Sequence, residues 1–260
     1  MRDFTFIMDY NKIAKKYNDR YTSDNYDAIK DYLLGFVKKH SPSRILEIGC
    51  GTGFWIKYLG EFNYNVFGCD KSIKMLEESK LAGNKNIFLS AAEELSVKKN
   101  SFDMIFCINA LHHFSNQEKF IEDVSGLLKM NGVFLIISVD PQNQGDYWYL
   151  YDYFDGVFEN DKKRFARWSQ ISNWLNLNGL RDVCINRVVT ITKTFVNNEV
   201  FKDKFLQKHN SSQLAEMSDE DYEKGVNKIK RKISYAEKQN SRIIFNTRIT
   251  FSAVAGKKDG

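Results

Sequence analysis

The sequence has few cysteines and no long apolar run. Its four cysteines, Cys50, Cys69, Cys107 and Cys184, include no Cys-x-x-Cys pair, and three of them fall in or beside runs typical of buried strands. No apolar run approaches the roughly 18 residues that would cross a bilayer. The first residues, Met1 to Phe4, carry no signal-peptide pattern. We therefore expect reduced core cysteines and a cytoplasmic protein.

The chain also has little excess of charge of either sign. Lysine and arginine number 38 and aspartate and glutamate 33, a formal net charge of +5 at pH 7. Such a mildly basic surface allows an anionic partner but does not require one. With 260 residues, 43% of them hydrophobic, the chain can form one α/β domain with a sizeable core and a small appendage.

The most informative stretch runs from Arg44 to Gly53. The segment Ile45–Ile48 has the apolar character of a short strand buried on both faces of a parallel sheet. A helix-like segment resumes at Phe54. Three glycines stand between strand and helix: Gly49, Gly51 and Gly53. Because glycine permits a tight turn and lets a ligand approach bare backbone, this pattern predicts a nucleotide-binding corner.

The spacing of these glycines separates two classes of nucleotide-binding protein. The dinucleotide fingerprint G-x-G-x-x-G would need a glycine at position 54, where this chain has Phe54. The pattern is instead E-x-G-x-G-x-G, with Glu47 inside the strand. It resembles the first motif of the class I S-adenosylmethionine (SAM) methyltransferases. The resemblance implies SAM as the cofactor, no metal, and a cofactor site that includes Glu47, Gly49, Cys50, Gly51 and Gly53.

An acidic residue ends the second expected strand, Asn65–Cys69. Asp70 is placed to accept hydrogen bonds from both ribose hydroxyls of the cofactor. The alternative is that Asp70 caps the next helix, but Ser72 is better placed for that. The family resemblance implies that Lys71 lies beside the adenine, with its stem packed there and its charge in water.

The segment after the third expected strand, Ile87–Leu89, departs from the family pattern. The family often has an aspartate where Ala91 stands, and that aspartate binds the adenine amino group. We therefore expect adenine recognition to rest on backbone groups near Ala92 or on Glu93.

Two adjacent histidines follow the fourth expected strand, Ser101–Asn109. The run from Asn109 to His113 resembles the loop after strand four in the methyltransferase type 11 group, where cofactor and substrate meet. The resemblance implies that Asn109 and Ala110 contact the cofactor. It makes His113, and after it His112, a candidate general base or substrate contact. The alternative is that both histidines only pack the loop.

The first 40 residues have a helical pattern. The run from Tyr10 to Tyr17 resembles the N-terminal segment of small-molecule methyltransferases, which folds over the cofactor. The resemblance implies that Tyr17 contacts the methionine end of SAM. Plain helix packing is the alternative for this tyrosine.

Further strands are expected at 133–139, 180–196 and 242–255. A Ser115-x-x-Glu118 capping box predicts a helix before the fifth strand, and Met130–Gly132 a turn. We therefore predict a doubly wound α/β fold with a seven-stranded, mostly parallel Rossmann-like sheet, an antiparallel last strand and a helical lid. Its ligands are expected beyond the carboxyl ends of the strands.

Within a single domain we expect four functional parts. These are an N-terminal helical lid at 1–40, a SAM-binding core at 41–140, and cap insertions at 141–168 and 197–241. Six of the eight residues from Tyr147 to Phe154 are aromatic. They predict either a cap with its own small core or the wall of a substrate pocket, including an aromatic cage for a cation. The basic cluster Lys228–Lys232 predicts a solvated helix face, with phosphate binding as the alternative.

These features predict a SAM-dependent methyltransferase that acts on a small molecule by in-line displacement. Three alternatives stay open: a tRNA-modifying methyltransferase, a SAM-binding module without catalysis, and a nicotinamide dehydrogenase. Phe54 argues against the dehydrogenase. The sequence does not identify the acceptor atom or the oligomeric state.

Overall fold

The computed structural model describes residues 25–208 and 210–259. Their contacts divide the chain into two compact units. The core unit contains residues 25–140, 166–189 and 251–259, and the accessory unit contains residues 141–165 and 190–250 without residue 209. Each unit has its own buried apolar cluster or clusters.

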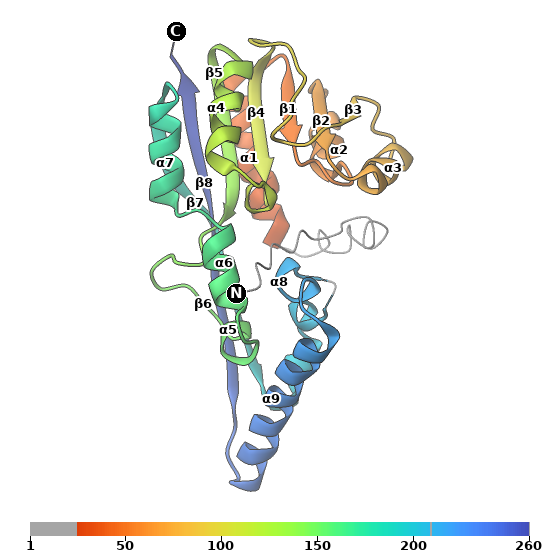
Figure 1. Ribbon diagram of the computed structural model, residues 1–260, viewed down its shortest axis with the longest axis vertical. Coiled ribbons are helices and arrows are strands. Elements are labelled where there is room, and N and C mark those ends of the chain that lie inside the picture. The colour runs from red at the N-terminus through yellow and green to blue at the C-terminus, as the bar shows by residue number, and fades with distance from the viewer. Residues whose placement is uncertain (1–24, 209, 260) are drawn as a thin grey trace. The chain divides into compact units, whose positions relative to one another are not determined.

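The core unit alternates strands and helices along the chain (Figure 1). Its elements are α1 (Asn25–His40), β1 (Ile45–Ile48), α2 (Phe54–Gly60), β2 (Val66–Asp70), α3 (Ile73–Leu81), β3 (Ile87–Leu89), β4 (Phe102–Ile108), the 3-10 helix η3 (Leu111–His113), α4 (Gln117–Leu127), β5 (Leu128–Val139) and α7 (Trp168–Leu177). Two long strands, β7 (Leu180–Val196) and β8 (Ile244–Lys258), have residues in both units.

The sheet has the order β3-β2-β1-β4-β5-β8-β6, and β7 pairs with β8. Strands β1 to β5 pair in parallel, whereas β8 is antiparallel to β5. The predicted Rossmann-like α/β fold with an antiparallel C-terminal strand is therefore confirmed. The predicted number of seven strands is wrong by one, because the two-residue strand β6 (Tyr147–Trp148) adds to β8.

The central strands β1, β4 and most of β5 are buried on both faces, and residue parity decides which face each side chain covers. On β4, Ile105 and Cys107 join the cluster that contains α4 and α7 side chains. The intervening Met104 and Phe106 join the cluster that contains α1 and α2. This two-sided burial explains why the strands read as continuous apolar runs.

Two local predictions about this region are wrong. The cap of α4 is Asn116, whose side chain accepts a hydrogen bond from the Lys119 N–H at 3.0 Å, rather than Ser115. The segment 130–132 is not a separate turn, because β5 already begins at Leu128. The register between β4 and β5 shifts between the pairs Phe102–Leu128 and Met104–Val133, and Asn131, with φ of +63°, lies within this irregular part of β5.

The accessory unit is mainly helical, apart from β6 and its parts of the long strands β7 and β8. It contains β6, α5 (Leu150–Tyr153), α6 (Val157–Arg164), the 3-10 helices η4 (Asn197–Lys202) and η5 (Lys204–Leu206), α8 (Ser212–Ala215) and α9 (Asp219–Lys238). Its core joins aromatic residues such as Trp148 and Phe154 to Ile229 and Ile233 of α9. The expectation that the aromatic run buries a core of its own is thus confirmed.

The cysteines behave largely as predicted. Cys50, Cys69 and Cys107 are buried and free, and Cys184 is free and exposed. Burial raises the pKa of Cys107 to about 12, so its thiol stays protonated. Among the described residues, no helix has the length and apolarity needed to cross a membrane.

Candidate functional site

A pocket in the core unit lies where the parallel strands end. Its walls come from the segments that directly follow β1, β2, β3 and β4. Eleven residues proposed from the sequence line it: Glu47, Gly49, Cys50, Gly51, Asp70, Lys71, Ala92, Glu93, Asn109, Ala110 and His113. Segments far apart in the sequence therefore meet at one site, as expected for the carboxyl edge of a parallel sheet.

Gly49 lets the loops after β1 and β4 approach closely. Its φ is +73°, in the left-handed region that glycine adopts at little cost. A Cβ at this position would lie 2.5 Å from the Cβ of Ala110, which is too close for any side chain. The backbone of this turn therefore forms part of the pocket wall. A ligand can approach it without meeting a side chain at position 49.

Gly53 has a packing role and does not line the pocket. Its φ is also +73°, and a Cβ there would lie 2.2 Å from both Ser79 Oγ and Asn84 Nδ2. Asn84 Nδ2 donates a hydrogen bond to the Gly53 carbonyl at 3.1 Å. The third glycine of the motif thus allows the start of α2 to pack against the end of α3.

Asp70 is fixed in place by backbone groups. Its Oδ2 accepts from the Gly51 N–H at 2.8 Å, and its Oδ1 accepts from the Ser72 N–H at 2.8 Å. Burial raises the pKa of Asp70, and these two hydrogen bonds oppose that rise. Each carboxylate oxygen has a second acceptor site, so Asp70 can still bind ligand hydroxyls while it holds the glycine loop. Ser72 caps α3 through Met75, as predicted.

Glu47 belongs to the pocket lining and lies inside the sheet. Its side chain is 1% exposed, and its Oε2 has no hydrogen-bond partner among the described residues. Burial, with the negative charge of Asp70 nearby, raises the pKa of Glu47 well above its ordinary value. Burial of this kind favours the neutral form of the carboxyl over the charged one, and the hydrogen-bonding capacity of Oε2 is not filled by any described residue.

The residues that the sequence suggested for adenine recognition differ in their burial and in their hydrogen bonds. Ala92 is buried in its wall, and Lys71 lines it. Glu93 is already engaged, because its Oε1 accepts from the Ser115 N–H at 2.6 Å and from Ser115 Oγ at 2.8 Å. Burial raises the pKa of Glu93, but the Ser115 hydrogen bonds outweigh it and the pKa is lowered. Glu93 is therefore an ionised residue that ties the loop after β3 to the segment before α4.

The two histidines differ in position. Both lie in η3, with ring centroids 4.0 Å apart. His113 lines the pocket, whereas His112 is not part of its lining. Asn109, at the end of β4, has a φ of +52° and turns the chain into this short helix. The lining thus contains His113, the candidate that the sequence already ranked first. Tyr17 lies outside the described residues.

The apolar part of the pocket wall was not predicted from the sequence. Trp55, Met75, Ile108 and Phe114 line the pocket, together with Ser90. Trp55 and Met75 are nearly fully buried. The available signal was position. Ile108 ends β4, Trp55 and Met75 lie in the helices that follow β1 and β2, and Phe114 directly follows η3.

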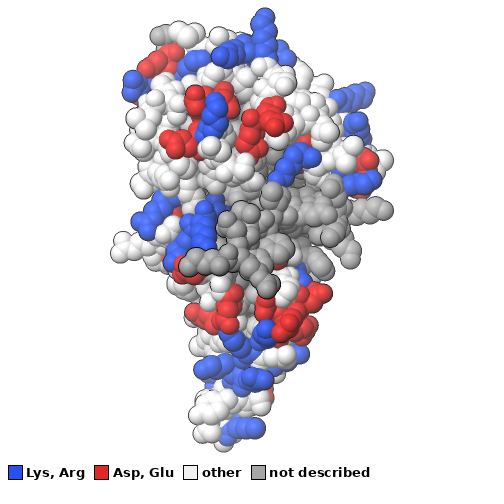
Figure 2. Space-filling model, in the orientation of Figure 1, with Lys and Arg blue, Asp and Glu red and all other residues white. Residues whose placement is uncertain are grey.

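Charge on the described surface is mixed. On the face in Figure 2, lysine and arginine side chains are interspersed with aspartate and glutamate. Lys228, from the basic cluster on α9, binds the Asp155 carboxylate at 2.6 Å. This residue at least is neutralised within the accessory unit, which favours the solvated helix face predicted for the cluster over phosphate binding.

Comparison with known proteins finds similarity in the central part of the chain. The family model for a methyltransferase domain matches residues 46–136. An uncharacterized methyltransferase of Bacillus subtilis is 32% identical over 134 residues, which cover 49% of this chain and 53% of that protein. A ubiquinone biosynthesis O-methyltransferase of Pelagibacter ubique is 30% identical over 126 residues, covering 46% of this chain and 52% of that protein. The matched region thus spans about half the length of these relatives.

The fold is shared more widely than the sequence. A putative methyltransferase from an antibiotic biosynthesis pathway of Anabaena variabilis has a TM-score of 0.61 and 22% sequence identity. The match covers 82% of this chain and 90% of that one. At this level of identity the similarity concerns the fold.

Proposed function

We propose that the chain is a class I S-adenosylmethionine-dependent methyltransferase, that its core-unit pocket binds SAM and that the enzyme methylates a small molecule. The observation that carries this proposal is the composition of the pocket. The close glycine turn, the anchored Asp70 and the unmatched Glu47 oxygen all come together at the carboxyl edge of the parallel sheet.

The pocket residues fit the chemical groups of SAM. Asp70 would hold the ribose hydroxyls with charge-assisted hydrogen bonds, and Lys71 and Ala92 would border the adenine. The bare backbone at Gly49 and Gly51 would allow close approach of the amino-acid portion. The apolar side chains Trp55, Met75, Ile108 and Phe114 would exclude water from the ligand. When bound, SAM supplies an activated methyl group on a sulfonium centre.

Beyond binding the cofactor, the protein has mainly to position the reacting groups. Methyl transfer is an in-line displacement, and holding the reacting groups in line can supply roughly 7–11 kcal/mol of barrier reduction. A general base is needed only where the acceptor atom still carries a proton. We assign that role, or a substrate contact, to His113, because it lines the pocket and His112 does not.

We further propose that the cap segments at 141–168 and 197–241 select the methyl acceptor. Support comes from the accessory unit, which comprises most of both segments and has an apolar core of its own. Such a segment can differ between enzymes without altering the cofactor pocket, so it is the part of the chain expected to select the acceptor.

The first experiment is methyl transfer from methyl-labelled SAM into a cell extract, with the products fractionated into metabolites, RNA and protein. The proposal predicts label in the metabolite fraction, lost in an Asp70→Ala enzyme. Nuclease-sensitive label would replace the small-molecule proposal with RNA modification. Confirmed SAM binding with no label in any fraction would favour a binding module without catalysis.

His113 can be tested on the labelled metabolite once it is isolated. A His113→Gln enzyme should lose about 10²–10⁴-fold in turnover for a base role, with unchanged affinity for S-adenosylhomocysteine. His112→Gln is the matched control and should retain most activity. Full turnover by the His113→Gln enzyme would remove the base role.

A further inference from the structure

The accessory unit contains a second pocket, separate in its lining from the core-unit pocket. Its volume is about 580 Å³, within the range of small-molecule sites. Six aromatic residues form most of its wall: Tyr147, Trp148, Tyr149, Tyr151, Tyr153 and Phe158. The other lining residues are Pro141, Asp146, Asp152, Ile244 and Asn246.

Two acids line this aromatic pocket, and one of them is already paired, because Arg248 Nε lies 4.0 Å from Asp146 Oδ1. Its lining includes Asp146 and Asp152 and no lysine or arginine. Asp146 already accepts hydrogen bonds from the Thr250 N–H at 2.8 Å, Thr250 Oγ1 at 2.9 Å and Asn143 Nδ2 at 3.1 Å. Asp152 is exposed, and its carboxylate makes no hydrogen bond or ion pair that we find within the described chain. Asp152 is therefore the group that can meet the charge of a ligand.

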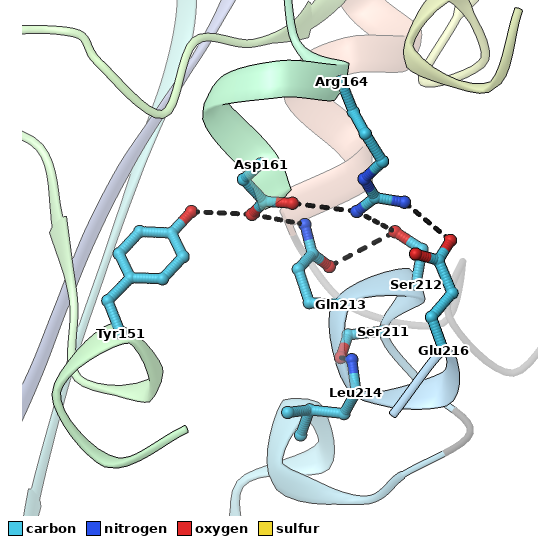
Figure 3. Close-up of polar contacts among 8 residues, drawn as sticks. All are labelled: Tyr151, Asp161, Arg164, Ser211, Ser212, Gln213, Leu214 and Glu216. Atoms are coloured by element: carbon cyan, nitrogen blue, oxygen red, sulfur yellow. Dashed lines mark hydrogen bonds and ion pairs between the residues drawn. The ribbon is translucent and has the colours of Figure 1, made fainter. Parts of the chain in front are cut away.

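Buried acids hold two of the tyrosine rings in place. Tyr151 Oη donates to Asp161 at 2.9 Å, and Asp161 is itself held by Arg164 at 2.8 Å and Gln213 at 3.0 Å (Figure 3). Tyr149 Oη donates to the buried Asp203 at 3.0 Å. Because these hydroxyls are tied to carboxylates, the rings are fixed before any ligand arrives, which lowers the entropic cost of binding.

The same unit already places ammonium groups over aromatic rings. Lys162 Nζ lies 4.9 Å from the centroid of Phe158, a residue of the pocket wall, and also pairs with Glu159 at 2.6 Å. Lys193 Nζ lies 4.5 Å from the centroid of Phe205. Such contacts are the intramolecular form of the cation–π attraction that an aromatic cage offers to a ligand.

We propose that the aromatic pocket binds the ammonium group of a small organic cation, with the tyrosine rings as its cage and Asp152 as its counter-ion. The aromatic faces attract a desolvated positive charge, and the acidic lining excludes an anion. The inference concerns the accessory unit alone and does not depend on methyl transfer, so it can fail or succeed independently of the proposed activity.

The test is calorimetric titration of the full-length protein with choline and with 3,3-dimethylbutan-1-ol. The second probe has nearly the same shape and carbon in place of the charged nitrogen. The proposal predicts saturable choline binding, with the neutral probe about tenfold weaker or more, because only choline gains the cation–π and carboxylate contacts. Equal affinity for both probes, or no binding of choline, would overturn it.

Two pairs of variants locate the site. Tyr147→Leu removes an exposed ring of the cage and should weaken choline binding about five- to tenfold, whereas Tyr147→Phe should not. Tyr235→Leu, at an exposed tyrosine of α9 outside the pocket, is the control.

Asp152→Asn keeps the shape of the side chain and should weaken the binding of choline, but not the binding of the neutral probe. Glu223→Gln, at an exposed acid on α9, is its control. Unchanged choline affinity in both Tyr147→Leu and Asp152→Asn, with the fold intact by circular dichroism, would place the cation elsewhere and contradict the proposal.

Discussion

Burial controls the protonation of two glutamates with different roles. Burial raises the pKa of Glu47, inside the parallel sheet and in the lining of the proposed cofactor pocket, well above its ordinary value. Glu216, in the accessory unit, binds Arg164 at 2.7 Å (Figure 3). Burial raises the pKa of Glu216 to about 7; Arg164 opposes this rise, and Asp161 adds to it.

Replacement of Glu216 tests this account through the pH dependence of stability. The pKa of Glu216 is higher in the folded protein than its ordinary value of 4.5, so the folded state binds the proton more tightly. Its contribution to stability is therefore full below about pH 4.5 and is lost as the pH rises towards 7. Relative to Glu216→Gln, the wild type should lose about 1–3 kcal/mol of unfolding free energy between pH 5 and 8.

Urea unfolding at a series of pH values measures this difference. Glu223→Gln, at an exposed glutamate, should show the pH dependence of the wild type. If wild type and Glu216→Gln lost stability in parallel across this range, the assigned protonation of Glu216 would be wrong.

Single residues were predictable from the sequence where they stand in a motif. Glu47, Gly49, Gly51, Asp70, Asn109 and His113 lie in the pocket that the motifs indicated. Trp55 and Phe114 were not foreseen, because an aromatic side chain after a strand has the same sequence signature whether it packs in the core or lines a pocket. The contact between Glu93 and Ser115 joins residues 22 apart, and no local pattern reports it.

At the scale of elements, capping and packing decide where helices begin. Asn116 and Ser115 are both good cap residues, and the structure uses Asn116 because Ser115 binds Glu93. The two-residue strand β6 is too short for alternation to reveal. The long elements α9 and β8 were predictable from apolar periodicity over several turns or residues, and β4 from its continuous apolar run.

The packing of α2 against α3 can be tested at Gly53. A Gly53→Ala side chain would meet Ser79 Oγ and Asn84 Nδ2 in addition to the strain of a positive φ. We expect a loss of about 2–5 kcal/mol in unfolding free energy, from strain of about 1–2 kcal/mol and overpacking of about 1–3 kcal/mol.

Gly179→Ala provides the matched control for that substitution. Gly179 has a φ of +76°, and a Cβ there would meet nothing within 4 Å, so only the strain should remain. Equal losses in the two variants, measured by urea unfolding, would show that close packing at Gly53 contributes nothing.

For the whole molecule, the sequence indicated the core unit better than the accessory unit. The parallel strands carry family motifs and two-sided apolar runs, which predict the sheet directly. The accessory unit is assembled from residues 141–165 and 190–250, separated by α7 and the first part of β7. Its division from the core depends on long-range packing, and the cap boundaries predicted at 141–168 and 197–241 stay predictions.

The separate cores of the two units predict separate responses to core substitutions. Ile229→Ala, at a fully buried position of α9, should destabilise the accessory unit by about 2–5 kcal/mol. Hydrogen exchange measured by mass spectrometry should accelerate in accessory-unit amides and stay unchanged in β1, β2 and β4. Ile121→Ala in α4 is the reciprocal control. Faster exchange throughout the chain in both variants would mean that the units unfold together.

The most direct test of the central claim is the affinity of the protein for S-adenosylhomocysteine, measured by calorimetry in wild type, Asp70→Ala and Asp103→Asn. Asp103 is the control, because it also accepts a backbone hydrogen bond, from Arg44 N–H at 2.9 Å, but lies outside the pocket. Hydrogen bonds to a charged group contribute about 1.5–3 kcal/mol each. We predict that Asp70→Ala weakens binding by about 10²-fold or more, while Asp103→Asn binds as the wild type does. Unchanged affinity in a folded Asp70→Ala protein would contradict the proposed cofactor site.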